Sequence, residues 1–371
     1  MNDVKEPVRI GIVGCGVVMT EAYMPLIESL QYKQQAKVTI ACDVAESKRG
    51  KLKERFGITR FTTDYNEVVS SDEVDLVMVL TSMLEHAEIT MAALRAGKHV
   101  LVEKPMATTF EEASDIVELS RESKGHLLCA PHIILSPTYQ TIWRRVHAGN
   151  IGRVCLARAR YGWAGTWWGK WFYRPGGGAI FDLAVYNMIS LTGLLGPVKR
   201  VTAMVGIAIP ERIVDGERIK VEAEDNAHIL LDFGNSVFAV VTTGWTMQKY
   251  RSPAIELYGT SGTIQMLGDD WDPNGYEIWQ NEVGAWQVFE ETHANWPWTD
   301  GLRHLVECIH AGRELLIRPE HALHVVEVML KAQESGRDGQ ARTIDTIFPP
   351  LDFEESLETE AAHLIHDRSR S

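Results

Sequence analysis

Up to about residue 131, short apolar runs alternate along the chain with longer amphipathic stretches. The amphipathic stretches, such as EHAEITMAALRAG and TFEEASDIVELSRESKG, have the hydrophobic period of helices. The apolar runs have the composition of strands that are buried on both faces, and they span residues 8–14, 37–43, 75–81, 99–103 and 126–131. This βαβ alternation predicts a parallel, doubly wound sheet for residues 1–131.

Beyond residue 150, the apolar runs follow one another with Gly, Asn and Asp turns between them, and LDFGNSVF has the pattern of a β-hairpin. The predicted strands lie at 153–163, 199–209, 227–234, 236–245, 254–260 and 262–267. One helix is expected after the triple glycine and another near residues 320–336. We therefore predict that residues 132–371 form a second α/β domain with a mostly antiparallel sheet. Its polar tail from residue 351 is either a solvated helix or an oligomer arm.

The composition is that of an ordinary globular protein, and 371 residues are long for a single core. The formal net charge of −13 argues against nucleic acid as a partner. No apolar run approaches the roughly 20 residues of a membrane span, and the polar N-terminus is unlike a secretory signal. Five cysteines without CxxC spacing are typical of reduced thiols, so a cytoplasmic location is expected.

A glycine-containing turn joins the first predicted strand to the first predicted helix. Gly14 and Gly16 permit the close backbone approach that a dinucleotide pyrophosphate needs at a helix N-terminus, and Val17 and Val18 follow at the start of that helix. Met19 replaces the third glycine of the usual fingerprint. The motif by itself is weak evidence, because an ordinary strand–helix turn has a similar composition.

Further polar residues follow the other predicted strands. Asp43 ends the second predicted strand. The dinucleotide-binding sequence pattern has a carboxylate at this place, which accepts hydrogen bonds from the adenosine ribose hydroxyls. This carboxylate would repel a 2′-phosphate, so NAD is favoured, although Arg49 keeps NADP open and Asp43 could instead be a helix N-cap. Thr81 and Glu103-Lys104 also lie at strand ends. Because ligands of open parallel sheets bind at the carboxyl ends of the strands, this edge is the predicted site.

The stretch RPGGGAIFDLAVY contains a carboxylate in apolar surroundings. Asp182 is the only charged residue between Arg174 and Lys199, and such a group is costly to bury without a partner. If the stretch is helical, Asp182 and Tyr186 share one face, because they are four residues apart. We therefore expect both side chains to face a common partner.

The blocks AGKHVLVEKPMATTFEEA and GGGAIFDLAVY, with LRHLVECIHAGRELLIRPEHALHVVEVMLKAQESGR near the end, resemble the Gfo/Idh/MocA family of glucose–fructose oxidoreductase and inositol dehydrogenases. The resemblance covers nearly the whole chain. It implies a Rossmann domain followed by an α/β domain with an open mixed sheet, and a homo-oligomer built through that sheet. It also implies a cis Lys104–Pro105 peptide bond and a cofactor-side role for His86.

The same resemblance implies that Lys104, Asp182 and Tyr186 meet beside the nicotinamide, as catalytic residues acting on a secondary alcohol. A tyrosine with a pKa near ~10 is a poor base at neutral pH, but a neighbouring ammonium would favour its phenolate. Asp182 would hold Lys104 charged and orient the substrate. Whether Tyr186 or Lys104 passes the proton stays open at this point.

The substrate class is suggested by the aromatic residues before the triple glycine. Trp168 and Trp171 suit the apolar faces of sugar rings, so we expect them to contact the substrate. The preferred hypothesis is an NAD-dependent oxidoreductase acting on a sugar, glycoside or cyclic polyol, with 3-oxidation of a glycoside as the favoured reaction. The alternatives are an NAD-dependent glycosidase that oxidises C3 transiently, and a dinucleotide-sensing regulator without catalysis.

Some features depart from the family or imitate another site. Ser82-Met83 stand where relatives have Pro-Asn, and apolar residues replace an arginine before Pro137. The run Asp270–Gly275 imitates a calcium loop, but its twelfth position is Asn281 rather than glutamate, and its flanks are predicted to be strands rather than helices. His321 and His324 share a helix face without an acidic third ligand, so we interpret them as structural. No metal is expected.

Overall fold

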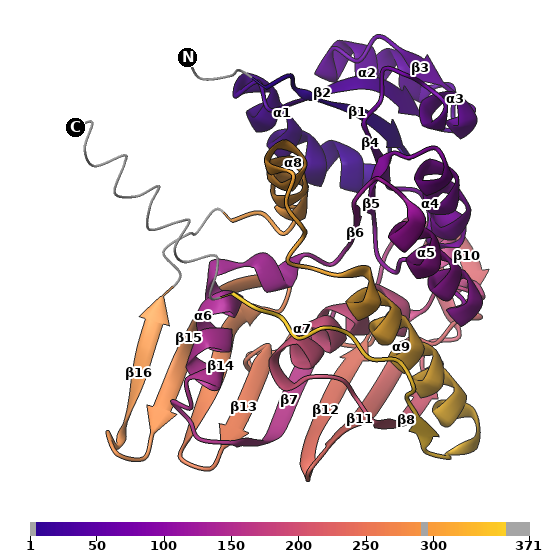
Figure 1. Cartoon of the computed structure of the whole chain (residues 1–371). Coiled ribbons are helices and arrows are strands. Elements are labelled where there is room, and N and C mark those ends of the chain that lie inside the picture. The colour runs from indigo at the N-terminus through magenta and orange to yellow at the C-terminus, as the bar shows by residue number, and fades with distance from the viewer. Residues whose placement is uncertain (1–4, 291–295, 354–371) are drawn as a thin grey trace, which may run out of the picture.

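The computed structural model describes residues 5–290 and 296–353, and it divides them between two large sheets (Figure 1). In the first sheet every neighbouring pair of strands is parallel, in the order β3-β2-β1-β4-β5-β6. The predicted doubly wound Rossmann fold is thereby confirmed. The strands are β1 (Val8–Val13), β2 (Ala36–Cys42), β3 (Phe61–Thr62), β4 (Leu76–Val79), β5 (His99–Val102) and β6 (Leu127–Cys129). The helices are η1 (Val18–Tyr23), α1 (Met24–Tyr32), α2 (Lys48–Phe56), α3 (Tyr65–Val69), η2 (Met83–Glu85), α4 (His86–Arg95) and α5 (Phe110–Glu122).

The second sheet is mixed and has nine strands, in the order β16-β15-β14-β13-β7-β12-β11-β8-β17. Only β12 and β7 pair in parallel, and the other pairs are antiparallel. Its strands are β7 (Val154–Gly162), β8 (Arg200–Gly206), β11 (Asn226–Gly234), β12 (Val237–Gly244), β13 (Ile255–Gly259), β14 (Gly262–Asp269), β15 (Asp272–Gln280), β16 (Ala285–Glu290) and β17 (Arg342–Thr343). The helices of this half are η3 (Ile133–Leu135), α6 (Pro137–His147), η4 (Lys170–Tyr173), η5 (Ile180–Ala184), α7 (Val185–Leu195), α8 (Gly301–Ala311) and α9 (Pro319–Asp338).

The sequence prediction for this half was incomplete. The hairpin of β9 (Glu211–Val214) and β10 (Glu217–Lys220) was missed, although Asp215-Gly216 is a turn signal and both residues have positive φ, at 52° and 77°. Strand β15 was predicted only as the strand after the calcium-like run, and its start was missed because it begins with turn-forming residues. Strand β16 was missed because all six of its residues are exposed, so it lacks an apolar alternation. The tail beyond residue 353 lies outside the described residues.

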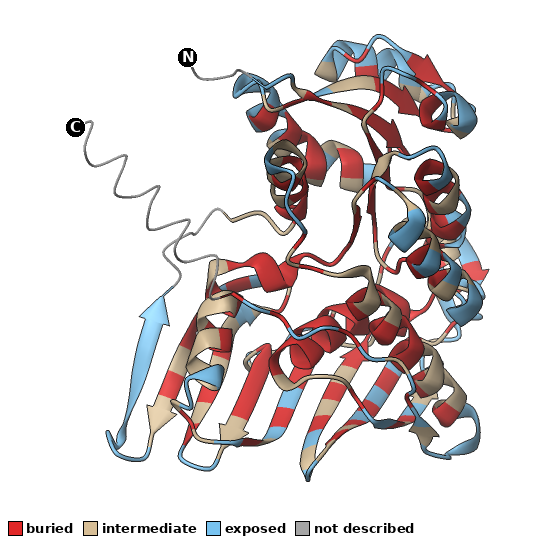
Figure 2. Cartoon of the chain, in the orientation of Figure 1, coloured by how far each residue is buried: buried red, intermediate tan, exposed pale blue. Residues whose placement is uncertain are grey.

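The two sheets differ in how their faces are covered. Helices lie on both faces of the first sheet, whose strands β4 and β5 are buried almost throughout. The second sheet has α6, α7 and α9 on one face, and its central strands show alternating buried and exposed residues (Figure 2). The open face presents exposed apolar side chains, including Leu156, Met204, Leu230 and Phe238.

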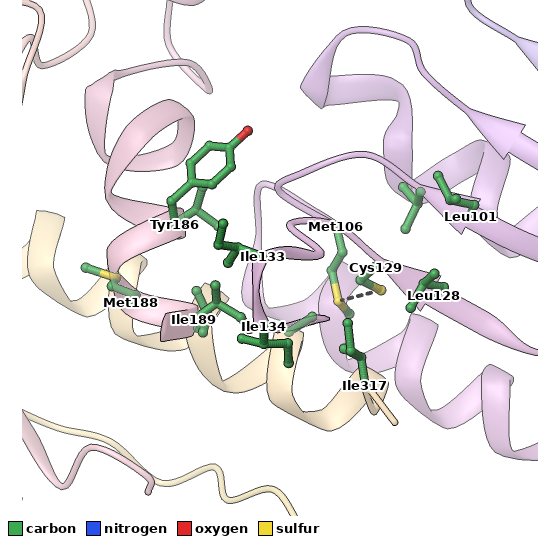
Figure 3. Close-up of a cluster of buried hydrophobic side chains, with 14 of the residues drawn as sticks. Leu101, Met106, Leu128, Cys129, Ile133, Ile134, Tyr186, Met188, Ile189 and Ile317 are labelled. Carbon is green, nitrogen blue, oxygen red and sulfur yellow. Dashed lines mark hydrogen bonds between the residues drawn. The ribbon is translucent and has the colours of Figure 1, made fainter. Parts of the chain in front are cut away.

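Apolar side chains join the two halves. Figure 3 shows Ile133 and Ile134 of η3 with Ile189 of α7, packed toward Met106 and Leu128 of the first half. This packing fixes the start of α7 against the edge of the first sheet where the strands end. The hydroxyl of Tyr186 points away from the cluster (Figure 3).

Segments from the C-terminal half also return to the first half. Thr299 Oγ1 donates to the backbone oxygen of Ala22 at 3.4 Å, and Lys5 Nζ donates to the backbone oxygen of His310. The division near residue 131 therefore stays a prediction, since α8 packs beside the first sheet (Figure 1). Within the described ranges, no helix is long and apolar enough to span a membrane.

Candidate active site

The glycine turn after β1 forms a cradle that side chains would fill. Gly14 has a φ of +95°, and a Cβ there would lie 2.5 Å from the backbone of Leu80. Its amide donates to the oxygen of Cys42 at 2.9 Å, which ties the turn to β2. A Cβ on Gly16 would meet nothing within 4 Å, so open space lies above the turn. This arrangement fits a ligand backbone that approaches the turn closely.

The neighbouring residues complete this edge. Val17 and Val18 stand at the start of η1, and Val17 is 56% exposed. Met19, in the position of the missing third glycine, is fully buried in the core. At the end of β4, the buried hydroxyl of Thr81 has no hydrogen-bond partner among the described residues. An orphaned hydroxyl at this edge is consistent with a cofactor partner, because buried polar groups are normally paired.

Asp43 is held in place at the end of β2 by two backbone amides. Its Oδ2 accepts from the Cys15 amide and its Oδ1 from the Ala45 amide, both at 2.9 Å. It is not the N-cap of α2, because that position belongs to Ser47. Lys48 Nζ lies 2.5 Å from Asp43 Oδ2. Burial alone would raise the pKa of Asp43, but Lys48 and the two amides lower it below the ordinary value.

Lys48 is a cation that the sequence prediction did not identify. Arg49, which was considered instead, pairs with Glu46 and lies over the ring of Phe61, 4.9 Å from its centroid. The sequence gives little indication that Lys48 contacts Asp43, because lysines are common in solvated helices of mixed charge.

The Glu103-Lys104-Pro105 segment follows β5, and the Lys104–Pro105 bond is cis, as predicted. Glu103 accepts from the buried hydroxyl of Tyr23 at 2.8 Å and from the Lys104 amide at 3.1 Å. The ring of His86 lies between two backbone oxygens, with Nδ1 2.7 Å from Pro105 and Nε2 3.2 Å from Thr81. The buried His86 ring therefore joins these two strand ends to each other, whereas we had expected it to face the cofactor.

The structure brings Lys104, Asp182 and Tyr186 together. Lys104 Nζ donates to Asp182 Oδ1 at 2.7 Å and to the backbone oxygen of Asp182 at 2.9 Å. It also lies 5.2 Å from the centroid of the Tyr186 ring, in a cation–π arrangement. Asp182 in η5 and Tyr186 in α7 are one helical turn apart, so both face the strand end that carries Lys104.

The glycines before η5 allow the helix to start where it does. A Cβ on Gly177 would lie 2.3 Å from the oxygen of Phe172, and Gly178 has a φ of +108°. A Cβ on Gly178 would meet the carboxylate of Glu224 at 2.2 Å. Glu224 accepts from the amide of Ile180 at 3.2 Å, so a carboxyl oxygen satisfies a backbone N–H at the start of the helix.

The surroundings of Tyr186 keep its hydroxyl protonated. Burial raises the pKa of Tyr186 well above its ordinary value, and the negative charges of Glu103, Asp182 and Asp270 add to the effect. Lys104 lies over the ring face, where it contacts the π system. The lowering of the Tyr186 pKa that was expected from Lys104 is therefore outweighed.

Two buried side chains next to this trio were missed in the sequence. The indole N–H of Trp245 donates to Asp182 Oδ2 at 3.2 Å. Asp270 accepts from Asn187 Nδ2 at 2.6 Å and from Ser190 Oγ at 2.8 Å, one turn beyond Tyr186. Complete burial raises the pKa of Asp270 to about 7. Sequence gave no signal for Trp245 and a misleading one for Asp270, which lies in the calcium-like run.

The aromatic residues expected to contact substrate lie one layer further out. Trp171 stacks on Phe172 with ring centroids 3.7 Å apart, and Trp168 meets the same ring edge-on at 5.2 Å. Phe172 in turn packs against Trp245 at 6.0 Å. Trp168 and Trp171 are partly exposed, so part of their ring surface stays free, and their packing reaches Asp182 only through Phe172 and Trp245.

The predicted structural role of His321 and His324 agrees with their contacts. His321 Nε2 lies 2.7 Å from Thr192 Oγ1, and the Val198 amide donates to His324 Nε2 at 3.0 Å. Both histidines thus join α9 to the end of α7. Among the residues that the structure describes, no group of three or more His, Cys, Asp and Glu side chains could hold a metal ion.

The chain is similar in sequence or in fold to several known dehydrogenases. The chain is 26% identical to D-xylose dehydrogenase of Paenarthrobacter nicotinovorans, over 81% of this chain and 84% of that protein. It is 23% identical to the NADP(+)-dependent scyllo-inositol 2-dehydrogenase of Bacillus subtilis (strain 168), over 90% and 95%. Levoglucosan dehydrogenase, solved with NADH and levoglucosan, has the same fold, with a TM-score of 0.81 at 19% identity, covering 92% of this chain and all of that one.

Two family descriptions match separate parts of the chain. Residues 8–130 match the oxidoreductase family with an NAD-binding Rossmann fold, and residues 139–265 match the GFO/IDH/MocA C-terminal domain. Together they cover the glycine turn, the Lys104 segment and the helix with Asp182 and Tyr186. The chain therefore belongs to the Gfo/Idh/MocA family of NAD-binding oxidoreductases.

Proposed function

We propose that the protein is an NAD-dependent dehydrogenase that oxidises a secondary hydroxyl of a sugar, glycoside or cyclic polyol. The observation that carries this proposal is the contact between Lys104 Nζ and Asp182 Oδ1 at 2.7 Å, at the carboxyl edge of the first sheet. The substrate class is supported by relatives that are named xylose and scyllo-inositol dehydrogenases.

The edge of the first sheet would hold the cofactor. NAD, when bound, supplies the hydride acceptor for the oxidation. The open space above the glycine turn suits a pyrophosphate, and the ordered carboxylate of Asp43 suits the ribose hydroxyls. The residues proposed to contact NAD are Gly14, Gly16, Val17, Val18, Asp43, Thr81, Glu103 and Lys104. His86 would act indirectly, by holding the two strand ends that carry Thr81 and Pro105.

Lys104 is assigned the transfer of the hydroxyl proton. Two of the three hydrogens of its ammonium group are used by Asp182, so the third can reach a substrate oxygen. In the oxidation, the neutral amine accepts the hydroxyl proton and Asp182 stabilises the ammonium that forms. The oxidation rate should therefore rise with pH, whereas the reverse reaction needs the charged lysine and should slow.

Tyr186 is assigned the orientation of the substrate oxygen. Its raised pKa keeps the hydroxyl neutral, so Tyr186 acts as a hydrogen-bond donor rather than as a base. The partly exposed faces of Trp168 and Trp171 suit a pyranose ring. Within this class we propose a glycoside, because its second ring or aglycone would meet this aromatic surface, and we propose C3 as the position oxidised.

The test is to incubate the purified protein with NAD and a panel of sugars, glycosides and inositols. The proposal predicts NADH formation and a product that has lost two hydrogen atoms, as measured by mass spectrometry. The Lys104→Ala variant is the control and should form both far more slowly. Release of an aglycone without net NADH would identify the glycosidase alternative. A catalytically silent protein that binds NAD would contradict the proposed function.

We also propose that the open face of the second sheet joins copies of this chain. The support is the exposed apolar set on that face, where Phe238 of β12 pairs with Leu156 of β7. Analytical ultracentrifugation should find an oligomer that Leu230→Lys dissociates. A monomeric parent protein would contradict this assignment without affecting the proposed chemistry.

A further inference from the structure

Trp245 fixes the oxygen of Asp182 that Lys104 leaves free. Trp245 follows directly after β12, and its side chain is fully buried. Its indole N–H donates to Asp182 Oδ2 at 3.2 Å, while Oδ1 accepts from Lys104 Nζ at 2.7 Å. Each oxygen of the carboxylate thus has a different donor, so the rotation of the carboxylate is restricted.

Both the backbone N–H and the backbone oxygen of Trp245 make hydrogen bonds. Its amide donates to the oxygen of Asp225 at 2.8 Å, and its oxygen accepts from Arg212 Nη2 at 2.7 Å. Its ring meets Tyr173 edge-on, with centroids 4.9 Å apart, and Phe172 at 6.0 Å. The position of the indole N–H is therefore set by contacts that lie away from Asp182.

Arg212 comes from the β9–β10 hairpin, which projects from the second sheet. The guanidinium group is largely buried, with Nη1 donating to the oxygen of Ala164 at 2.6 Å and Nη2 lying 3.2 Å from Asp225 Oδ2. It also lies over the Tyr173 ring, 5.3 Å from its centroid. A fork of donors shared among three acceptors anchors the hairpin more specifically than one contact would.

The partner of Arg212 is fixed as well. Asp225 is fully buried, and its oxygens accept from the amides of Ala208 at 2.7 Å and Ile209 at 3.1 Å. A buried carboxylate with these donors and a guanidinium partner is a rigid point in the fold. The contacts therefore run without interruption from the hairpin through Trp245 to Asp182.

We propose that Arg212 and Trp245 are positioning residues for the catalytic pair. Through them the β9–β10 hairpin holds the Asp182 carboxylate so that Oδ1 faces Lys104. The inference rests on the proposed function, because it assigns Lys104 the proton transfer. It goes further because it gives the β9–β10 hairpin, which does not touch Lys104 itself, a role in orienting the carboxylate that pairs with Lys104.

The Lys104 ammonium and the Trp245 N–H share the negative charge of the Asp182 carboxylate. A hydrogen bond to a carboxylate stabilises the anion and reduces the charge available to its other partner. Without the indole N–H, the Asp182 charge is compensated chiefly by the Lys104 ammonium. Asp182 then holds the Lys104 ammonium more strongly, so the neutral amine needed for the oxidation forms less readily.

Trp245→Phe tests this directly, since it keeps an aromatic ring against Tyr173 and removes the N–H donor. With a confirmed substrate, kcat/KM should fall by about tenfold, as expected for a lost hydrogen bond to a charged group. The rise of the oxidation rate with pH should move to higher pH. In an Asp182→Asn background the same substitution should have little further effect, because the two changes act on one interaction. Equal effects in both backgrounds would overturn the proposal.

A second readout needs no substrate. The pH dependence of Lys104 acetylation, followed by mass spectrometry, should shift upward in Trp245→Phe and not in the Asp182→Asn double variant. If no sugar is turned over by the parent protein, the proposed function fails while this measurement still tests the positioning. An acetylation profile that stays unchanged or moves downward in Trp245→Phe would overturn the positioning role.

Matched variants separate positioning from general loss of packing. Trp143→Phe removes the indole of another buried tryptophan, which packs on His147 and Phe353, and it should leave the Lys104 profile unchanged. Arg212→Lys keeps the charge beside Asp225 but loses the fork, so it should give a smaller upward shift than Trp245→Phe. If the acetylation profile of Lys104 is the same as in the parent in both Arg212→Lys and the more disruptive Arg212→Met, then the hairpin does not position Asp182.

Discussion

The cofactor edge and the catalytic helix form the two sides of the site, and they are built in different ways. On the cofactor side, the backbone defines the shape of the site. There is no room for a side chain at Gly14, and two backbone amides orient the Asp43 carboxylate. On the catalytic side, buried side chains surround Asp182 and Tyr186, and their charges interact at short range.

This difference determines how each side should respond to substitution. Changes at the cofactor edge act through shape and should alter affinity for NAD with little effect on pH dependence. Changes around the catalytic helix act through charge and hydrogen bonding in a low-dielectric environment. They should alter turnover and its pH profile while NAD still binds.

The largest effect at the cofactor edge is expected for Gly14→Ala. A side chain there would lie 2.5 Å from the Leu80 backbone at a φ of +95°. The turn would have to move to relieve this clash and the unfavourable φ, so the amides and open space that face the pyrophosphate would be displaced. We expect NAD affinity to fall by about 10- to 100-fold, measurable by calorimetry. Gly16→Ala is the control for folding, because its Cβ meets nothing within 4 Å, and its thermal unfolding should match the parent. Parental NAD affinity in Gly14→Ala would show that the turn is not the cradle.

On the catalytic side, Tyr186→Phe should have a smaller effect than the loss of Lys104. The raised pKa keeps the Tyr186 hydroxyl neutral, so the substitution removes a hydrogen bond. We expect kcat/KM to fall by about tenfold, mainly because KM rises, while the dependence of the rate on pH stays unchanged. A fall of ~10²–10⁴-fold in kcat would instead identify Tyr186 as the base and reverse our assignment.

A moderate change in cofactor preference is expected for Asp43→Ser. The substitution removes the carboxylate proposed to accept the ribose hydroxyls and frees Lys48, which lies 2.5 Å from it, to approach a phosphate. NAD affinity should fall by a few-fold to about tenfold, with a relative gain for NADP. Titrations of both cofactors provide the measurement, and an unchanged ratio of affinities would exclude Asp43 as the ribose ligand.

The smallest effect on turnover at neutral pH is expected for Asp270→Asn, whose consequence lies in stability. Burial raises the pKa of Asp270 to about 7, whereas an unfolded aspartate titrates near ~3.9. Between these values the folded state keeps a proton that the unfolded state releases, so the contribution of Asp270 to stability falls as pH rises to about 7.

Asp270→Asn should remove this pH dependence. Its unfolding free energy relative to the parent should therefore increase by ~1–3 kcal/mol between about pH 4 and pH 8. Urea denaturation at both pH values measures the difference, with Asp215→Asn, at an exposed position of the β9–β10 turn, as the control. An equal difference at both pH values would contradict the raised pKa of Asp270.

The same contrast explains how much could be predicted from sequence. The first sheet was identified because its buried strands are continuous apolar runs, and Gly14, Asp43 and Lys104 follow from where those strands end. The trio of Lys104, Asp182 and Tyr186 required the family resemblance, because its members are far apart in the chain.

The residues that sequence did not reveal act through long-range contacts. Trp245 reaches Asp182 across 63 positions, and Tyr23 reaches Glu103 across 80. Such pairs leave no local period, spacing or turn signal. The sequence also could not show that Lys104 would face the ring of Tyr186, since that depends on how η3 and α7 pack against the first sheet.

The central claim is that Lys104, oriented by Asp182, passes the hydroxyl proton. It is tested most directly by the turnover of one confirmed sugar by Lys104→Ala as a function of pH, with NAD affinity measured in parallel. We predict a fall of ~10²–10⁴-fold in kcat, NAD affinity close to that of the parent, and partial recovery when a small primary amine is added. Near-parental turnover in Lys104→Ala, with the same pH profile, would contradict the account.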